Sequence, residues 1–289
     1  MSRPVDRVIN ELLLQQIREL EQILNSDVFF YYGPLDEGMV QAFISVLEGL
    51  TEDGEKRENL SIILTTNGGS AIAVERMVNA IRHHYRNVNF FVPECAYSAG
   101  TIFCMSGDNI YMSYTSVLGP IDPQVKNRDG NWVPALGYLD KINELLDRAR
   151  AEEISSSEFL ILKDFDLSEI RSYEHARDLT VELLKKWLVK YKFRMWETRK
   201  TSGKKVTDKL KKERAERIAK QLGDNKLWLS HGRPIGLEQL RELDLIIEDY
   251  GENKPLKTAL DEFYQLLRDY IIKNGAIICM QTRIGGVLQ

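Results

Sequence analysis

Two short segments of this 289-residue chain carry residue types that could perform acyl transfer. Ser98 follows the apolar run 88–93, where a helix is expected to begin, and Gly68-Gly69 follows the β-branched run 60–66. A serine at that position can act as a nucleophile, because the N–H of Ala99 and the positive end of the helix dipole stabilise negative charge nearby. Adjacent glycines let further N–H groups point outward with no Cβ in the way. Together the two segments offer a nucleophile and an oxyanion hole.

Each segment also has an ordinary structural explanation. A serine at the start of a helix is usually an N-cap, and a glycine pair after a strand usually makes a turn. The combination is more informative, because the segments lie one βα unit apart and consecutive strands tend to be neighbours in a sheet. From these residues alone, Ser98 is a candidate nucleophile with oxyanion donors around Gly68, Gly69 and Ala99, and the structural explanation of each segment stays open.

The elements that must position these residues alternate between strand and helix. Strands are predicted at 27–33, 60–66, 88–93 and 109–112, and apolar side chains recur at helical spacing between them. This alternation predicts an α/β fold with a mostly parallel, buried sheet, in which ligands bind at the carboxyl ends of the strands. From residue 136 onward the pattern is mostly helical, with helices at 167–195, 207–222, 237–243 and 256–273 and one more strand at 245–249.

Three parts are expected along the chain. Residues 1–24 form an N-terminal amphipathic helix, residues 25–250 form the central domain with a basic helical insertion at about 185–222, and residues 251–289 form a C-terminal helical extension.

Three motifs carry a family resemblance. They are TTNGGS (65–70), AYSAGT (96–101) and DNIYMSYTSVLGPIDPQ (108–124). They resemble the ClpP/crotonase superfamily over about residues 25–250. LGPIDPQ (118–124) and HGRPI (231–235) point to its ClpP-class serine dehydrogenase proteinase family, which is similar to the signal peptide peptidases and membrane-bound ClpP-class proteases. The resemblance implies a spiral of ββα units with additional C-terminal helices, a nucleophile at Ser98 and an oxyanion hole at Gly68, Gly69 and Ala99.

The general base has more than one candidate in the sequence. ClpP carries its histidine in the segment that matches residues 119–123, where this chain has Asp122. His231 lies in the later segment where such folds bring back a triad member, and a neutral imidazole can take a serine proton at neutral pH. We expect a Ser98–His231 pair with Asp122 orienting the imidazole. An equally acceptable interpretation is that His231 only braces the turn at Arg233.

Other residues could replace members of this triad. Signal peptide peptidases and membrane-bound ClpP-class proteases use a lysine as the base, so Lys126 and Lys141 are alternatives. Asp164 matches an acid of the family and is an alternative orienting group. Cys95 lies near Ser98 but has no histidine nearby in sequence, so it is better explained as a small buried hydrophobe.

Composition narrows the class of protein. Apolar residues make up 43% of the chain, which is enough for a core. Three cysteines without a CxxC pair suit a reducing, cytoplasmic compartment. Metal-ligand spacing and a P-loop are both missing, so we expect no metal, no cofactor and no ATP hydrolysis. No segment approaches the length of an apolar membrane span, and the first residues lack the apolar run of a signal peptide.

The net charge of −4 conceals a basic block. Between Lys185 and Lys220 there are 15 Lys and Arg against 4 Asp and Glu, a local charge of +11. The block is either a solvated helical face or a contact for an acidic surface on another subunit or protein. Nucleic-acid binding is not expected, because the aromatic residues of the block recur at the spacing of a helix face packed on a core.

The sequence therefore predicts an ATP-independent, ClpP-like serine endopeptidase that cleaves peptides or unfolded protein segments, with homo-oligomer formation implied by the resemblance. The main alternative is a catalytically silent scaffold of the same fold that binds a peptide or partner protein. A crotonase-type thioester enzyme is a third possibility, although it would have less need of the serine.

Overall fold

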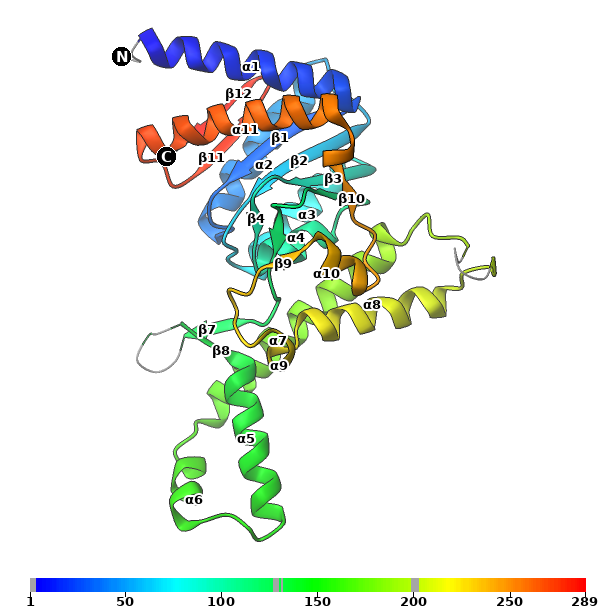
Figure 1. The fold of residues 1–289 in the computed structure, drawn as a ribbon. Coiled ribbons are helices and arrows are strands. Elements are labelled where there is room, and N and C mark those ends of the chain that lie inside the picture. The colour runs from blue at the N-terminus through cyan, green and yellow to red at the C-terminus, as the bar shows by residue number, and fades with distance from the viewer. Residues whose placement is uncertain (1–3, 127–129, 131, 199–202) are drawn as a thin grey trace.

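The main sheet is mostly parallel, as predicted. The computed structural model describes residues 4–126, 130, 132–198 and 203–289 (Figure 1). Within them seven strands form the main sheet, in the order β10-β5-β3-β2-β1-β11-β12. The parallel strands are β1 (Asp27–Tyr32), β2 (Asn59–Thr65), β3 (Asn87–Val92), β5 (Asn109–Met112) and β10 (Glu248–Asp249). The antiparallel strands β11 (Cys279–Thr282) and β12 (Gly285–Leu288) complete it.

Helices cover both faces of this sheet. Helices α1 (Pro4–Leu24) and α11 (Lys254–Asn274) lie side by side on one face (Figure 1). The other face is covered by α2 (Val40–Glu52), α3 (Ala71–His84) and α4 (Ala99–Met105), with a 3-10 turn at Glu37–Met39 before α2. Along β1, Val28 and Phe30 pack toward α1 and α11, whereas Phe29 and Tyr31 pack toward the opposite helices. Burial on both faces explains why the strands read as continuous apolar runs.

A second, smaller sheet stands beside the main one. It contains β4 (Cys95–Ala96), β6 (Val117–Leu118) and β9 (Ile235–Gly236), in that order. β4 and β6 are parallel, and β9 is antiparallel to β6. The succession β3, β4, α4 is one ββα unit of the predicted kind.

The remaining elements are mostly helical. A hairpin of β7 (Gln124–Lys126) and β8 (Trp132–Pro134) leads into α5 (Ala135–Arg150), α6 (Ser156–Lys163) and α7 (Leu167–Trp187). Helices α5 and α6 form an arm that projects away from the sheets (Figure 1). Helices α8 (Asp208–Leu222), α9 (Asn225–Trp228) and α10 (Leu237–Glu242) follow, and a 3-10 turn at Tyr250–Glu252 precedes α11.

The basic block lies partly inside the fold. It comprises the end of α7, a π-helical turn at Leu188–Lys192 and α8, so the single helix predicted over 167–195 is wrong beyond Trp187. Trp187 and Phe193 are buried in the main core, which explains the aromatic spacing and removes both rings as stacking platforms for bases. Part of its charge is paired within the chain, as between Lys186 and Glu75 at 3.5 Å.

In the predicted C-terminal helical extension, 251–289, the closing helix is present as α11, but residues 279–288 are not helical. They form the β11–β12 hairpin, in which Gln281 pairs with Phe30 of β1. Isolated four-residue strands carry little signal of their own, and this pair is held by its neighbours.

Arg283, between β11 and β12, anchors this hairpin. The residue is 3% exposed, and its Nη1 donates to Glu21 Oε1 at 2.8 Å and to Asp27 Oδ1 at 2.6 Å. Its Nε donates to Asp53 Oδ2 at 2.6 Å. Because Glu21 and Asp27 are also buried, one cation neutralises carboxylates from α1 and β1 and ties both ends of the chain to the sheet.

Candidate active site

The small sheet brings three predicted site residues to one edge. Ser98 follows β4, Asp122 follows β6, and His231 precedes β9. In the register, Ala96 pairs with Leu118 and Leu118 pairs with Ile235. Because β4 and β6 end where the antiparallel β9 begins, the residues just outside these strands meet at the same edge.

Ser98 has an unusual backbone conformation, and its hydroxyl does not cap α4. It stands immediately before α4 with φ 49° and ψ −115°, an uncommon region for any residue other than glycine. Its side chain makes no capping hydrogen bond, although its carbonyl oxygen accepts from the N–H of Ile102 at 3.2 Å. An ordinary N-cap serine would use its hydroxyl to satisfy the helix. The free hydroxyl on a strained turn instead resembles the exposed serine of a nucleophile elbow.

The glycine turn packs directly against this serine. Gly68 has φ 102°, and a Cβ built on it would lie 3.0 Å from Ser98 Cβ and 2.9 Å from the carbonyl oxygen of Tyr97. Gly69 has φ 151°, and its Cβ would lie 2.5 Å from the carbonyl oxygen of Leu35. Both positions therefore require glycine for conformation and for space.

The backbone donors near Ser98 are not equivalent. The N–H of Gly68 donates to Thr66 Oγ1 at 3.0 Å, and its carbonyl oxygen accepts from Leu35 at 2.9 Å. Among the described residues, the N–H groups of Gly69 and Ala99 have no hydrogen-bond acceptor. These two groups, rather than the N–H of Gly68, are the donors available to an oxyanion.

His231 and Asp122 form a hydrogen-bonded pair. His231 Nδ1 lies 2.9 Å from Asp122 Oδ1, and the two side chains are 19% and 4% exposed. With Nδ1 donating to the carboxylate, the neutral imidazole presents Nε2 as a proton acceptor. The backbone next to Asp122 is fixed by a hydrogen bond, in which the N–H of Ile121 donates to the carbonyl oxygen of Leu222 at 3.0 Å.

Ser98 and His231 are not in hydrogen-bond contact, since within the described residues His231 bonds to Asp122 and the Ser98 side chain makes no capping bond. Ser98 follows β4 and His231 precedes β9, and β6 lies between these two strands of the small sheet. Because the two side chains share no hydrogen bond, proton transfer between them requires their approach, which is common when catalytic contacts tighten around a substrate.

Two of the alternative site residues, Lys141 and Asp164, lie elsewhere in the fold. Lys141 is on α5 with its Nζ 2.8 Å from Glu144 Oε1, and its side chain is 56% exposed. The side chain of Lys126, on β7, lies outside the described residues. Asp164 ends α6 on the projecting arm, which Figure 1 places far from β9.

Cys95 is poorly suited to nucleophilic attack. Burial and the neighbouring carboxylate of Glu94 raise the pKa of its thiol to about 11. A thiol with that pKa carries little of the reactive thiolate at neutral pH.

Two threonines missed by sequence reasoning hold the site together. Thr66 accepts from the N–H of Gly68. Thr101 Oγ1 lies 2.8 Å from the carbonyl oxygen of Ala96 and 2.8 Å from that of Gly119, and either oxygen can accept its proton. The same hydroxyl accepts from the N–H of Gly119 at 3.0 Å. Thr101 thereby joins α4 to the ends of β4 and β6. Both lie in the motifs quoted above, but only the fold shows which groups their hydroxyls reach.

A serine nucleophile candidate, backbone N–H groups without acceptors among the described residues, and an Asp–His pair lie at this edge of the α/β fold, and these are groups that a serine hydrolase would need. A profile of the ClpP-like SDH-type serine proteinase family matches residues 52–208. The chain belongs to this family.

Among curated proteins, the chain is similar to two uncharacterized proteins of Methanocaldococcus jannaschii. It is 29% identical to MJ1495 over 217 residues and 26% identical to MJ0137 over 215 residues, which is 75% and 74% of this chain. The chain spans 59% of the length of each relative.

Among solved structures, the chain is similar to two mutants of the 1510-N membrane-bound stomatin-specific protease, one of them in complex with a substrate peptide. The TM-scores are 0.45 and 0.43, with 14% and 16% identity. Each match covers 78% of this chain, and 79% and 75% of the solved chains.

Candidate membrane spans and metal-binding clusters are both absent from the described residues. None of the helices they form is long and apolar enough to cross a membrane. Nor do they contain a group of three or more His, Cys, Asp or Glu side chains placed to hold a metal ion.

Proposed function

We propose that this chain is a serine endopeptidase that cleaves peptides or unfolded protein segments without ATP, with Ser98 as nucleophile. The observation that carries the proposal is the strained Ser98 turn, which packs on Gly68. Within the described residues the Ser98 side chain makes no capping hydrogen bond, and the N–H groups of Gly69 and Ala99 have no acceptor. Membership of a serine proteinase family supports the same reaction class.

In the proposed reaction, Ser98 Oγ attacks the carbonyl carbon of the scissile peptide and its proton passes to His231 Nε2. The carbonyl oxygen becomes an oxyanion that accepts from the N–H groups of Gly69 and Ala99. Collapse of this intermediate breaks the C–N bond, and the leaving amine takes the proton from His231. Water then hydrolyses the acyl-serine with His231 as base, while Asp122 keeps the imidazole in the required tautomer.

This assignment requires Ser98 and His231 to approach each other. We propose that substrate binding within a homo-oligomer brings the two side chains together. A carbonyl group seated against the free N–H donors would fill the space beside Ser98. The remaining candidates for the base are Lys141 and Lys126, with Asp164 as an alternative orienting acid.

Labelling with a fluorophosphonate tests the nucleophile and the base separately. Intact-mass analysis should show one adduct on the wild-type protein and none on Ser98→Ala. His231→Ala should label slowly, and Lys141→Ala should label at the wild-type rate because Lys141 is an exposed, paired residue. Loss of labelling in Lys141→Ala, with labelling kept in His231→Ala, would assign the base to the lysine.

The alternative is a catalytically silent scaffold that binds a peptide or partner protein at this edge. The lack of a hydrogen bond between Ser98 and His231 favours it. A folded protein that gives no Ser98-dependent adduct, and that hydrolyses no unfolded protein, would support the scaffold over the peptidase.

A further inference from the structure

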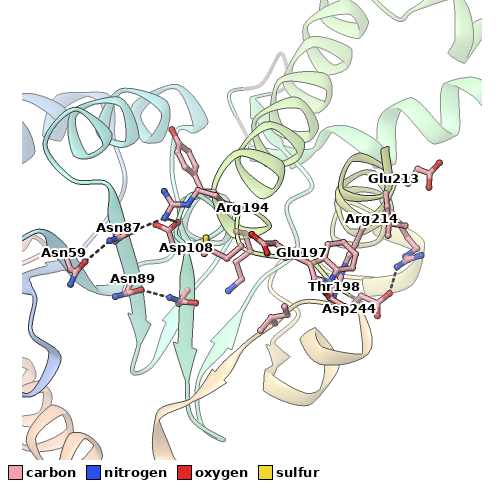
Figure 2. A pocket seen from close by; sticks show the side chains of 18 residues that line it. Asn59, Asn87, Asn89, Asp108, Arg194, Glu197, Thr198, Glu213, Arg214 and Asp244 are labelled. Carbon is pink, nitrogen blue, oxygen red and sulfur yellow. Dashed lines mark hydrogen bonds and ion pairs between the residues drawn. The ribbon is translucent and has the colours of Figure 1, made fainter. Parts of the chain in front are cut away.

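A second candidate site lies at the other edge of the main sheet. A cavity of about 1070 Å³ opens beside Asn59, Asn87 and Asn109, which begin β2, β3 and β5. Figure 2 shows Asn59, Asn87 and Asn89 on one side of this cavity and Glu197, Arg214 and Asp244 on the other. The cavity is thus at the amino ends of the strands, whereas Ser98 follows a strand at its carboxyl end.

Most cations around the cavity already have partners. Arg194 Nη2 lies 2.8 Å from Asp108 Oδ1, and Arg217 forms an ion pair with Asp244. Arg214 Nε donates to the backbone carbonyl oxygen of Asp244 at 3.0 Å. These groups shape the walls, and their charges are largely compensated.

Lys192 is different. The residue is 8% exposed and lines the cavity, and its Nζ makes no hydrogen bond or ion pair with the described residues. Burial lowers its pKa to about 8, although the carboxylates of Glu248 and Asp108 act in the opposite direction. A buried ammonium group without a direct partner is unfavourable, so an anion bound beside it would relieve that cost.

Asn89 supplies a second donor. Its Oδ1 accepts from Asn109 Nδ2 at 3.0 Å, which leaves the Asn89 amide N–H groups without an acceptor among the described residues. A carboxylate can accept from an ammonium and an amide at once. Met195, Leu210 and Ile246 also line the cavity and provide apolar surface for the rest of a ligand.

We propose that this cavity binds a small organic carboxylate with an apolar side group, held by Lys192 Nζ and Asn89 Nδ2. The proposal does not depend on peptidase activity, because Ser98, Asp122 and His231 do not line the cavity. The ligand could be a simple carboxylic acid or an amino acid, and the carboxylate of Glu197, which also lines the cavity, would favour the free amino group of the latter.

Titration calorimetry with three matched probes tests the site. N-acetylleucine carries the carboxylate, N-acetylleucinamide replaces it with a neutral amide, and leucine adds an α-ammonium group. We expect N-acetylleucine to bind at least about tenfold more tightly than N-acetylleucinamide. Leucine binding more tightly than N-acetylleucine would identify amino acids as the class, and the reverse order would identify simple carboxylic acids.

Two lysine variants show whether Lys192 holds the carboxylate. Lys192→Met keeps the length and removes the charge, and it should weaken N-acetylleucine binding about tenfold or more while raising the melting temperature. Lys190→Met removes an exposed cation from the same π-helical turn and should leave binding unchanged. At pH 8, wild-type binding should also take up about half a proton, as the anion raises the pKa of Lys192.

Three results would overturn the proposal. The first is no N-acetylleucine binding at about 20 mM, well above a millimolar dissociation constant. The second is equal binding by wild type and Lys192→Met. The third is a Lys192→Met protein that melts lower or fails to fold, because this would mean that Lys192 serves the fold.

Discussion

Replacing Gly68 with alanine would test whether the glycine turn positions the nucleophile by direct packing. The added Cβ would lie 2.9 Å from the Tyr97 carbonyl oxygen and 3.0 Å from Ser98 Cβ, so the Ser98 turn must shift by several tenths of an ångström. The φ of 102° adds backbone strain. Strain and overpacking together should lower the free energy of unfolding by about 2–4 kcal/mol. Since a misplacement of about 1 Å can cost about 100-fold in rate, acylation of Ser98 should slow by about 10–100-fold.

Gly54→Ala is the matched control. Gly54 also has a positive φ, 80°, but no atom lies within 4 Å of the Cβ that alanine would add. The free energy of unfolding of Gly54→Ala should therefore fall by about 1 kcal/mol through backbone strain alone, and its acylation rate should equal that of the wild type. Urea unfolding gives the free energies, and the rate of adduct formation with a fluorophosphonate gives acylation.

Two results would contradict this reasoning. A folded Gly68→Ala protein that acylates at the wild-type rate would show that packing on Gly68 does not set the position of Ser98. Equal loss of acylation in Gly68→Ala and Gly54→Ala would show that backbone strain, and not the contact, controls the rate.

Three further variants and reactions test other parts of the structure. Arg283→Met leaves two buried carboxylates without their cation, so the free energy of unfolding measured in urea should fall by about 3–5 kcal/mol. A fall of less than about 1 kcal/mol would refute the anchoring role. Asp122→Asn replaces a carboxylate oxygen with an amide N–H donor, which can hold His231 in the opposite tautomer, so acylation of Ser98 should slow by about 100-fold or more with little change in stability; an unchanged rate would place the base elsewhere. Because the pKa of Cys95 is raised from 9.0 to about 11, its thiolate fraction at pH 8 falls by about two orders of magnitude. Iodoacetamide should therefore modify Cys95 slowly at about pH 8, and the rate should increase as the pH rises toward about 11. Fast modification at about pH 8 would contradict the burial effect.

The parallel strands were predictable because their signal is local. Strands β1, β2 and β3 are runs rich in apolar and β-branched residues that end near Gly33, Asn67 and Pro93, and burial on both faces makes these runs nearly continuous. The C-terminal hairpin was not predictable in this way. Its strands are four residues each, and they exist because β11 pairs with β1 and Arg283 finds carboxylates far away in the sequence.

In the candidate site, too, features with a local sequence signal were predictable and features that depend on distant residues were not. Ser98 and the glycine pair could be chosen from sequence, because a hydroxyl at a helix start and two glycines after a strand have known chemical uses. The sequence could not show which N–H groups are available to an oxyanion, because this depends on the hydrogen bond that Thr66 accepts from the N–H of Gly68.

The sequence by itself determined the α/β class, the family motifs and the serine that could act as nucleophile. These follow from short-range patterns, in which each residue type has its meaning within a few neighbours. Only the tertiary structure decided that Asp122 and His231 meet at 2.9 Å, that Ser98 stands across a strand from His231, and that Lys192 is buried beside a cavity at the opposite edge. The reason is that these relations join residues far apart in the sequence, and strand order and helix packing fix their distances.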